Sequence, residues 1–580
     1  MKRIISLLLT LALLAGSVVI FASCGAPKDE GAEIKVYLSD NVYDFDPTAY
    51  YADSNAEQVM SLLYEPLFSL NEKGELKYAA ASKYVVDEAE RKIVITLRET
   101  YWSDTTRVLA SDFIYAWRDV ILEPNNANPA AALLFDIENA RDIKNGEESI
   151  YEFGAVASDD YELTISYREG ADYKQLLKNL AALPTSPLRE SVITEYNSGY
   201  WSKLINSAVT NGPFKLADVE DGNFTVARNV GYHQSPTVEN PTKQVTPNKL
   251  IKFTNSSDMS FNLTYEDIEK KVVFYMGDAS LADRKSNKDS ALVADDLSTY
   301  TYVFNTENPI FENEKVRQAL SLAIDRAKIV EAVTFGKAAT GFLPDNVLDN
   351  ATGNSFRGKA LISADAKLSE ARALLEDVDF TGISKSFTLS VSDNEEELAI
   401  AKIVADAWKS LGFTVKVEAL DSVSYKIKDF TNTDVSFKDS AVQNTVISAA
   451  RGARDFDVIG IDWQMYSTDA FVALSAFAKG FSGAGCDFEN NEKLVSFGGW
   501  SDVDYDKLIN EAFNAASDEA RSEALHDAEE LLVESGCVIP IIYNQTFAFV
   551  SSELSGVAFD GMGNIVFTKV KQKNYEEYLD

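Results

Sequence analysis

The chain has 580 residues, of which 90 are Asp or Glu and 54 are Lys or Arg, so its formal net charge at pH 7 is -36. This charge makes nucleic acids and anionic membrane surfaces poor partners. A composition of 46% hydrophobic and 25% charged residues is that of a globular protein and excludes both disorder and a protein with many membrane spans. Because the chain has only two histidines and three cysteines, we expect no His-based triad, no metal and no cofactor.

The first segment has the layout of a secretory signal. Lys2 and Arg3 precede an apolar run over residues 4–20, which ends close to a cysteine, Cys24. Small residues directly before this cysteine resemble the cleavage site of bacterial lipoproteins, so we predict a signal peptide over 1–23 and a lipid-modified Cys24. An uncleaved membrane anchor and a plain secreted protein are the alternatives. In each case the folded part lies outside the cytoplasm, and lipidation would anchor it to the cell membrane.

Periodicity then predicts strands and helices in alternation along the chain. Strands, where apolar residues alternate with others or run continuously, are expected over 34–38, 93–97, 413–417 and 538–543. Helices, where apolar residues recur every three or four positions, are expected over 111–120, 313–336, 398–412 and 517–536. Such alternation is typical of the α/β class with mostly covered sheets.

Two thiols, Cys486 and Cys537, remain in the mature chain. An exported compartment permits a disulfide between them, and two buried free thiols are the alternative. The spacing does not decide between the two.

Short motifs, taken in chain order, resemble those of the family 5 solute-binding proteins of peptide ABC transporters, which bind oligopeptides and dipeptides. Two positions depart from the family pattern, with Thr105 where glycine is usual and His233 where tryptophan is usual. The resemblance covers almost the whole mature chain. The matching segments include Asp46-Pro47, Leu63-Tyr64-Glu65-Pro66-Leu67, Trp102-Ser103-Asp104, Asn211-Gly212-Pro213-Phe214, Phe304-Asn305-Thr306 and Val316-Arg317-Gln318-Ala319-Leu320.

The resemblance implies an α/β fold like that of periplasmic binding proteins, two-lobed and of class II, which closes like a Venus flytrap and carries an extra inserted domain. The stretches over 243–296 and 421–454 fit the family poorly. The expected division is a tether over 24–33, lobe I over 34–69, 185–299 and 544–580, an inserted domain over 70–184, and lobe II over 300–543.

The resemblance also points to ligand-binding residues near Trp463. In oligopeptide binders, a carboxylate three positions after this tryptophan pairs with the amino terminus of the peptide, but here that position is Tyr466. Asp462 or Asp469 is expected to reach the same point, with an exposed loop acid as the alternative. Trp463 is expected to supply apolar surface, with core packing as the alternative. The residues that we expect to line the cleft are Trp463, Tyr466, Asp469, Asp462, Gln464, Tyr43 and Phe45, with simple packing as the favoured interpretation of the last two.

Other charged and polar residues are given structural roles. We expect Arg317, Asp325 and Arg326 to fix domain packing through ion pairs. His526 falls off the apolar stripe of its helix, so we expect it to be solvated, and we place His233 at a strand end.

The function implied is that of a lipid-anchored, monomeric receptor that is not an enzyme. It would capture oligopeptides in the interlobe cleft by hinge closure and deliver them to an ABC permease and its ATPase. Three alternatives remain open: a receptor for a non-peptide solute, a receptor for a peptide signal, and a secreted hydrolase that uses paired carboxylates.

Overall fold

The computed structural model describes most of the chain. The described residues are 31–37, 42, 44–48, 54–195, 201–203, 208–220, 223–237, 243–253, 265–275, 281–428, 434–450, 452–487, 492–493 and 497–574. Cys24 and Tyr43, the predicted lipidation site and one predicted ligand residue, lie outside this set. Among these residues, none of the helices has the length and the apolar character needed to cross a membrane.

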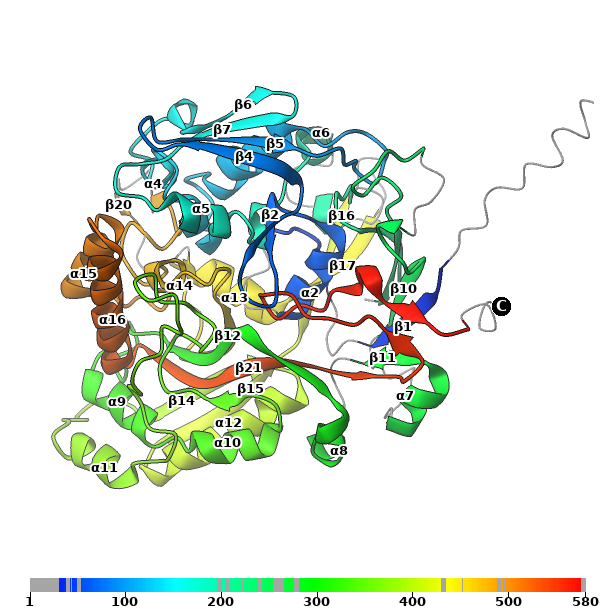
Figure 1. Ribbon diagram of the computed structural model, residues 1–580. Helices are drawn as coiled ribbons and strands as arrows, with labels where there is room; N and C mark the ends of the chain where they lie inside the picture. Colours follow the sequence, from blue (N-terminus) through cyan, green and yellow to red (C-terminus); the bar gives the residue numbers. More distant parts are fainter. Residues whose placement is uncertain are drawn as a thin grey trace, which may run out of the picture.

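One mixed sheet of eleven strands, counted over the described residues, runs through the molecule (Figure 1). One half of it, which we call the first lobe, contains β1 (Glu33–Tyr37), β8 (Phe214–Glu220), β9 (Asn223–Arg228), β10 (Lys249–Phe253) and β11 (Val273–Tyr275). In this half β1 lies between β10 and β11 and is parallel to both, whereas β10, β9 and β8 pair antiparallel. Helices α2 (Ser54–Leu63) and α7 (Tyr265–Lys271) lie with these strands, whereas α6 (Glu190–Glu195) lies beside the inserted sheet in Figure 1 and α8 (Leu281–Asn287) contacts the second lobe through the ion pair of Arg284 with Glu396.

The other half, the second lobe, has a parallel core. Its strands are β14 (Ser386–Ser392), β15 (Thr414–Leu420) and β18 (Val458–Gln464), with β14 parallel to both neighbours. Helices α9 (Glu314–Leu322), α10 (Arg326–Val333), α11 (Leu368–Glu376) and α12 (Glu395–Ser410) lie below the sheet in Figure 1. Trp408 of α12 is fully buried and its indole N–H donates to the Leu320 carbonyl, which ties α12 to α9.

Two long strands connect the halves. β12 (Leu292–Phe304) and β21 (Val538–Val550) pair antiparallel along their length, with an irregularity between Asp295 and Thr299. β21 also pairs with β11 in the first lobe, and β12 pairs with β18 in the second. The boundaries predicted at 299/300 and 543/544 fall inside these two strands. The predicted division of the chain is otherwise untested and stays a prediction.

The inserted segment forms a sheet of its own at the top of Figure 1, in the order β4 (Ala81–Asp87), β5 (Lys92–Leu97), β7 (Glu162–Ser166) and β6 (Ala155–Asp159). It meets the second lobe at α14 (Ala470–Ser475), α15 (Val503–Phe513) and α16 (Asp518–Ser535). The guanidinium of Arg168 lies 3.6 Å from the centroid of the Phe513 ring, and the amide of Asn145 donates to the Gly480 carbonyl over 2.9 Å. These contacts hold the segment against the second lobe.

The remaining elements are short. They are β2 (Phe68–Leu70), β3 (Leu76–Tyr78), α3 (Ala110–Ile114) with a π-helical continuation (Tyr115–Ile121), α4 (Ala140–Lys144), α5 (Tyr173–Asn179), β13 (Lys337–Ala338), β16 (Ser422–Lys428), β17 (Asp434–Ser440), α13 (Ala441–Ala450), β19 (Cys486–Asp487), β20 (Glu492–Lys493), β22 (Leu554–Ser555) and β23 (Lys571–Gln572). The stretch over 421–454 thus contains a β-hairpin and a helix.

The expected helix over 517–536 is confirmed. The Ser517 hydroxyl accepts the Ala520 N–H at its start, and Gly536, with φ of +63°, ends it. The single helix expected over 313–336 is wrong. The chain breaks after Leu322, because the Asp325 carboxylate accepts the Lys328 N–H and begins a new helix there.

Arg317 and Arg326 have the structural role that the sequence predicts, but not through ion pairs. Arg326 is 1% exposed and donates to the carbonyls of Pro540, Ser363 and Ser321, and burial lowers its pKa to about 10. Arg317 donates in the same way to the carbonyl of Ser535, at the end of α16, and to that of Phe311, before α9. Backbone carbonyls, and not carboxylates, are therefore the partners.

The two histidines and Cys537 make contacts within the protein. His233 lies in the turn after β9, where its Nε2 is 2.7 Å from Glu65 and its ring stacks on Tyr232. His526 is half-exposed, stacks on Phe356 and contacts Asp349. Cys537 is a buried free thiol, and burial raises its pKa to about 12, whereas the side chain of Cys486 lies outside the described set.

Candidate functional site

The predicted ligand residues on β18 point to opposite faces of the sheet. Trp463 is half-buried on one face, where its ring centroid lies 4.8 Å from Phe477 and 5.8 Å from Phe342. Asp462 and Gln464 share the other face, since side chains alternate along a strand. Trp463 therefore belongs to an aromatic cluster of the second lobe, and the polar pair faces away from that cluster.

Tyr466 occupies the position where oligopeptide binders carry a carboxylate. Its side chain is 6% exposed and its backbone has φ of +58°. Burial raises the pKa of its phenol, and the nearby Glu57 raises it further. The phenol is therefore neutral at physiological pH and cannot supply the negative charge.

Asp469 and Phe45 lie inside the protein. Asp469 is fully buried, accepts the Phe471 N–H at the start of α14 and pairs with Arg521 over 2.8 Å. Phe45 is 3% exposed and meets Phe224 edge-on at 5.9 Å between centroids. Asp469 thus already has a cationic partner, and both residues carry packing contacts. Their predicted ligand role is untested.

Four acids meet where the two lobes join, and we call them the hinge carboxylates: Glu57 of α2, Asp296 of β12, Asp462 of β18 and Asp560 of the C-terminal loop. Glu57 is 6% exposed and the other three are half-buried. Asn564 donates to Glu57 over 3.0 Å, and Asn544 donates to Asp462 over 2.8 Å. The Asp560 carboxylate accepts the N–H groups of Met562 and Asn564, each over 2.9 Å.

Burial raises the pKa of each hinge carboxylate, and repulsion between acids adds to this for three of them. Burial, with repulsion from Asp296, raises the pKa of Glu57 to about 8. Burial, with repulsion from Asp560, raises the pKa of Asp296 to about 7, and burial raises that of Asp560 to about 6. The pKa of Asp462 is raised by burial and by Glu397, whose carboxylate the Tyr300 hydroxyl holds close by. Burial and mutual repulsion therefore favour the neutral, protonated form of these acids.

A close backbone contact brings the C-terminal loop onto β12. Gly563 has φ of +94°, and a Cβ at this position would lie 2.9 Å from the Asp295 carbonyl oxygen and 3.1 Å from the Asp296 Cα. Only glycine fits such an approach without displacement. This contact, together with the Asn564 bond to Glu57, places acids that are hundreds of residues apart in the sequence beside one another.

Sequence reasoning missed Glu57, Asp296 and Asp560. A signal exists for Glu57, because it lies three positions before Met60, which is fully buried on the same face of α2. An acid on the buried face of a helix needs a partner or a function. Asp296 and Asp560 carry no comparable local signal.

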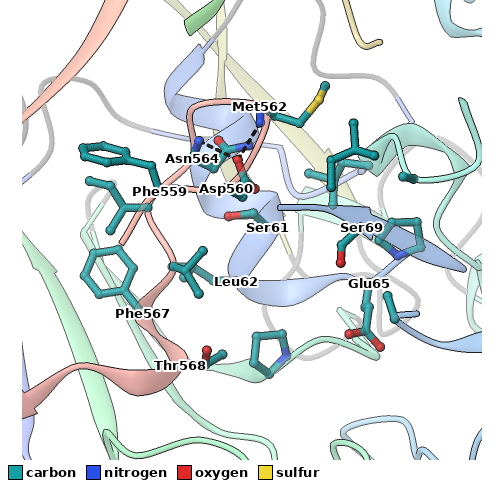
Figure 2. Close-up of a pocket in the computed structure, with 18 of the residues that line it drawn as sticks. Ser61, Leu62, Glu65, Ser69, Phe559, Asp560, Met562, Asn564, Phe567 and Thr568 are labelled. Carbon is teal, nitrogen blue, oxygen red and sulfur yellow. Dashed lines mark hydrogen bonds between the residues drawn. The ribbon is translucent and has the colours of Figure 1, made fainter. Parts of the chain in front are cut away.

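A cavity of about 560 Å³ is lined by two of the hinge carboxylates, Glu57 and Asp560 (Figure 2). Figure 2 shows Phe559, Asp560 and Asn564 of the C-terminal loop beside Ser61 and Leu62 of α2, with Ser69 and Glu65 on the other side of the view. Tyr64 also lines the cavity. Tyr64 is 2% exposed, and its hydroxyl finds no hydrogen-bond partner among the described residues. The lining of the cavity therefore mixes apolar side chains with polar and charged ones.

A second cavity of about 640 Å³ lies between the inserted segment and the second lobe. Its walls carry charges of both signs, from Lys73, Lys174, Lys178, Arg521, Asp136, Asp172, Asp349 and Asp518. Over the described part of the chain, no group of three or more His, Cys, Asp or Glu side chains could hold a metal ion.

Comparison with known proteins shows which family this chain resembles. The family model "Bacterial extracellular solute-binding proteins, family 5 Middle" matches residues 75–485. The dipeptide-binding protein DppE of Bacillus subtilis (strain 168) is 25% identical over 532 residues, which is 90% of this chain and 88% of DppE.

Solved structures share the fold. The OppA of Listeria monocytogenes bound to peptide has a TM-score of 0.74 at 21% identity, covering 93% of this chain and 99% of that one. The Escherichia coli murein tripeptide-binding protein MppA has a TM-score of 0.71 at 23% identity, covering 92% and 96%, whereas an unliganded open form of MppA scores 0.55 and covers 94% and 98%. The two-lobed α/β fold predicted from the motifs is confirmed, and the chain belongs to the bacterial extracellular solute-binding proteins of family 5.

Proposed function

We propose that this protein binds peptides in the cleft between its lobes and delivers them to an ABC importer as its substrate-binding component. Family membership and relatives named for dipeptide and oligopeptide binding support the peptide as ligand. The observation that carries the proposal is the two-lobed fold, in which the paired strands β12 and β21 cross from one lobe to the other.

The proposed mechanism is hinge closure. The pair β12 and β21 joins the lobes, and its irregularity between Asp295 and Thr299 is a natural point of bending. The whole-chain TM-score is 0.71 against one structure of MppA and 0.55 against its unliganded open form, which supports a closed arrangement here. Ligand contacts made by both lobes would stabilise this closed state over an open one.

The moving bodies follow the division predicted from the sequence. In this proposal lobe I, with residues 34–69, 185–299 and 544–580, carries the inserted domain over 70–184 and closes on lobe II over 300–543. The protein acts as a monomer with an ABC permease and its ATPase. It is held at the outer face of the cell membrane by lipid on Cys24, with two acyl chains providing stable attachment.

Peptide binding is tested by native mass spectrometry of the purified mature chain, followed by calorimetric titration with a library of peptides of two to nine residues. We expect a co-purified peptide or a measurable Kd for part of the library, together with a smaller radius of gyration on binding. Absence of binding across the library would refute the peptide as ligand. An unchanged radius of gyration with a bound peptide would refute hinge closure.

The anchor has a separate test. A Cys24→Ala variant should appear in the medium or the periplasm, and it should fail to incorporate labelled palmitate. Incorporation of the label by this variant would refute Cys24 as the modified residue.

A further inference from the structure

The loop that follows α14 in the second lobe is buried, although it contains neither helix nor strand. All of its residues over 480–485 are buried, and Gly480, Gly483 and Gly485 have φ angles of +79°, +71° and +83°. Loops ordinarily run over the surface of a protein, because their backbone groups need partners such as water. This loop lies instead against residues 124–129 of the inserted segment. We call residues 480–485 the glycine loop.

The backbone of the glycine loop lies directly against the backbone of the inserted segment. The Asn128 N–H donates to the Gly483 carbonyl over 2.8 Å. A Cβ at Gly483 would lie 2.1 Å from the Asn128 carbonyl oxygen, and a Cβ at Gly485 would lie 2.1 Å from the Pro124 carbonyl oxygen. Only glycine permits such an approach, because any other residue would place a carbon atom inside its neighbour. The two backbones therefore interlock.

Side chains from α4 and the residue after it hold the near end of the glycine loop. The Arg141 guanidinium lies 5.0 Å from the centroid of the Phe481 ring, which is 5% exposed. The Asn145 amide, which is also buried, donates to the Gly480 carbonyl over 2.9 Å. A cation over an aromatic ring and a buried hydrogen bond each favour the assembled arrangement. The contact therefore has specific side-chain partners as well as a close backbone fit.

A buried lysine shapes the surface that receives the glycine loop. Lys144 is fully buried, and its ammonium donates to the carbonyls of Ile121, Glu123 and Asn126. A buried ammonium needs acceptors of this kind, so it draws the three carbonyls together and fixes the turn that contains Pro124. All three acceptors belong to the inserted segment, so they hold this turn without help from the second lobe.

The inserted segment is fastened to the first lobe by a separate set of bonds. The Tyr101 N–H donates to the Gly231 carbonyl over 3.1 Å, and the Ser103 N–H donates to the Thr210 carbonyl over 2.8 Å. The segment also follows α2 and precedes β8 in the chain, and both of these elements belong to the first lobe. We therefore expect the inserted segment to move with the first lobe.

Asn128 contacts both lobes at once. It is 1% exposed, and its side-chain amide donates to the Thr48 carbonyl of the first lobe over 3.0 Å, whereas its backbone N–H donates to Gly483 of the second lobe. If the inserted segment moves with the first lobe, the bond to Thr48 persists during lobe motion. The bond to Gly483 and the interlocked backbones beside it then break when the lobes separate.

We propose that the glycine loop and Asn128 form a latch that holds the two lobes closed around the ligand. When the lobes separate, the glycine loop leaves residues 124–129, and when they close, the two backbones interlock again. A ligand that requires the closed state binds in proportion to the population of that state, so loss of the latch lowers its apparent affinity. This inference rests on the proposed hinge closure and assigns part of its free energy to a contact between the inserted segment and the second lobe.

The test variant is Gly483→Ala in the mature chain, because its Cβ would collide with the Asn128 carbonyl in the closed state. The matched control is Gly382→Ala. Gly382 has a similar φ of +77°, and a Cβ there would meet nothing within 4 Å, so this change adds the backbone strain without the collision. Asn145→Ala, which removes the bond to Gly480 without any collision, replaces Gly483→Ala if that variant fails to fold.

Two readouts are compared among wild type and variants. Calorimetric titration with tri-alanine and penta-alanine gives the affinity, and solution scattering gives the radius of gyration without peptide. We expect Gly483→Ala to bind about tenfold more weakly than wild type, Asn145→Ala about fivefold more weakly, and Gly382→Ala within twofold of wild type. We also expect ligand-free Gly483→Ala to have a larger radius of gyration than Gly382→Ala.

The affinities decide the outcome wherever a peptide binds wild type. A loss of less than threefold in Gly483→Ala, or of less than twofold in Asn145→Ala if it is the variant used, would overturn the latch and leave peptide binding intact. An equal loss in Gly382→Ala would overturn it too, since backbone strain alone would then explain the effect. If neither peptide binds wild type, the peptide proposal fails for these probes, and scattering alone decides on the latch. Equal radii for the ligand-free test variant and Gly382→Ala would then overturn it, and a larger radius for the test variant would support it.

Discussion

Replacing Glu57 by glutamine should stabilise the ligand-free protein at alkaline pH and have little effect at pH 5. The side chain is 6% exposed, and its pKa rises from 4.5 in the unfolded chain to about 8 in the folded protein. Between these values the folded protein binds more protons than the unfolded chain, so the free energy of unfolding falls as the pH rises. Glutamine has nearly the same shape and does not titrate.

The magnitude follows from the pKa values. A rise from 4.5 to about 8 corresponds to about 5 kcal/mol of stability that is present below pH 4.5 and is lost as the pH passes 8. Asp296 and Asp560 repel Glu57, so part of this fall in the free energy of unfolding comes from the ionisation of those two acids and not from Glu57 alone. We therefore expect the Glu57→Gln substitution to recover about 2–4 kcal/mol at pH 8.5.

The assay is urea unfolding of the ligand-free chain at pH 5.0 and pH 8.5, followed by tryptophan fluorescence. Glu90→Gln serves as the control, because this acid is exposed and its substitution should leave the pH dependence of unfolding as in wild type. Equal pH dependence in Glu57→Gln and wild type would refute the electrostatic reasoning. A variant that is less stable than wild type at pH 8.5 would refute it as well.

Three other changes test separate parts of the structure. Arg521→Met should cost about 3–5 kcal/mol in chemical unfolding, because it leaves Asp469 buried without its partner, and adding Asp469→Asn should restore part of the loss. Thr105→Gly should stabilise by about 1 kcal/mol and raise Tm, since φ at this position is +73°; a lower Tm would contradict this. Arg168→Ala removes the stacking on Phe513 between the inserted segment and the second lobe, so the ligand-free protein should show a larger radius of gyration in solution scattering. An unchanged radius would mean that this contact does not hold the lobes together.

The motifs of the sequence were sufficient to predict the family and with it the two-lobed fold. Local sequence patterns also predicted the helices and strands whose ends are set by residues close by in the sequence. The helix over 517–536 is an example, because its capping serine and its terminal glycine act within one turn of the chain. The strand expected over 93–97 likewise lies within β5, since alternation of side chains reports directly which face is buried.

The break between α9 and α10 shows where a continuous apolar pattern misleads. Residues on both sides of Ala323 face the same core, so periodicity alone joins them into one helix. The Asp325 side chain competes for a backbone N–H and starts a second helix, and the buried Arg326 fixes this break to Pro540. The partner of Arg326, the Pro540 carbonyl, belongs to a strand that is distant in the sequence, so no local pattern predicts this contact.

The candidate site depended even more on the tertiary structure. The sequence alone predicted a ligand role for Asp469 and Asp462, but it could not show that Arg521 already neutralises the first and that no cation in the described part of the chain pairs with the second. Glu57, Asp296 and Asp560 become one group only because Gly563 lets the C-terminal loop touch β12. A pattern of residues along a chain determines local hydrogen bonds and buried faces, whereas the energy of a charge depends on which distant segments surround it, and the fold alone decides that.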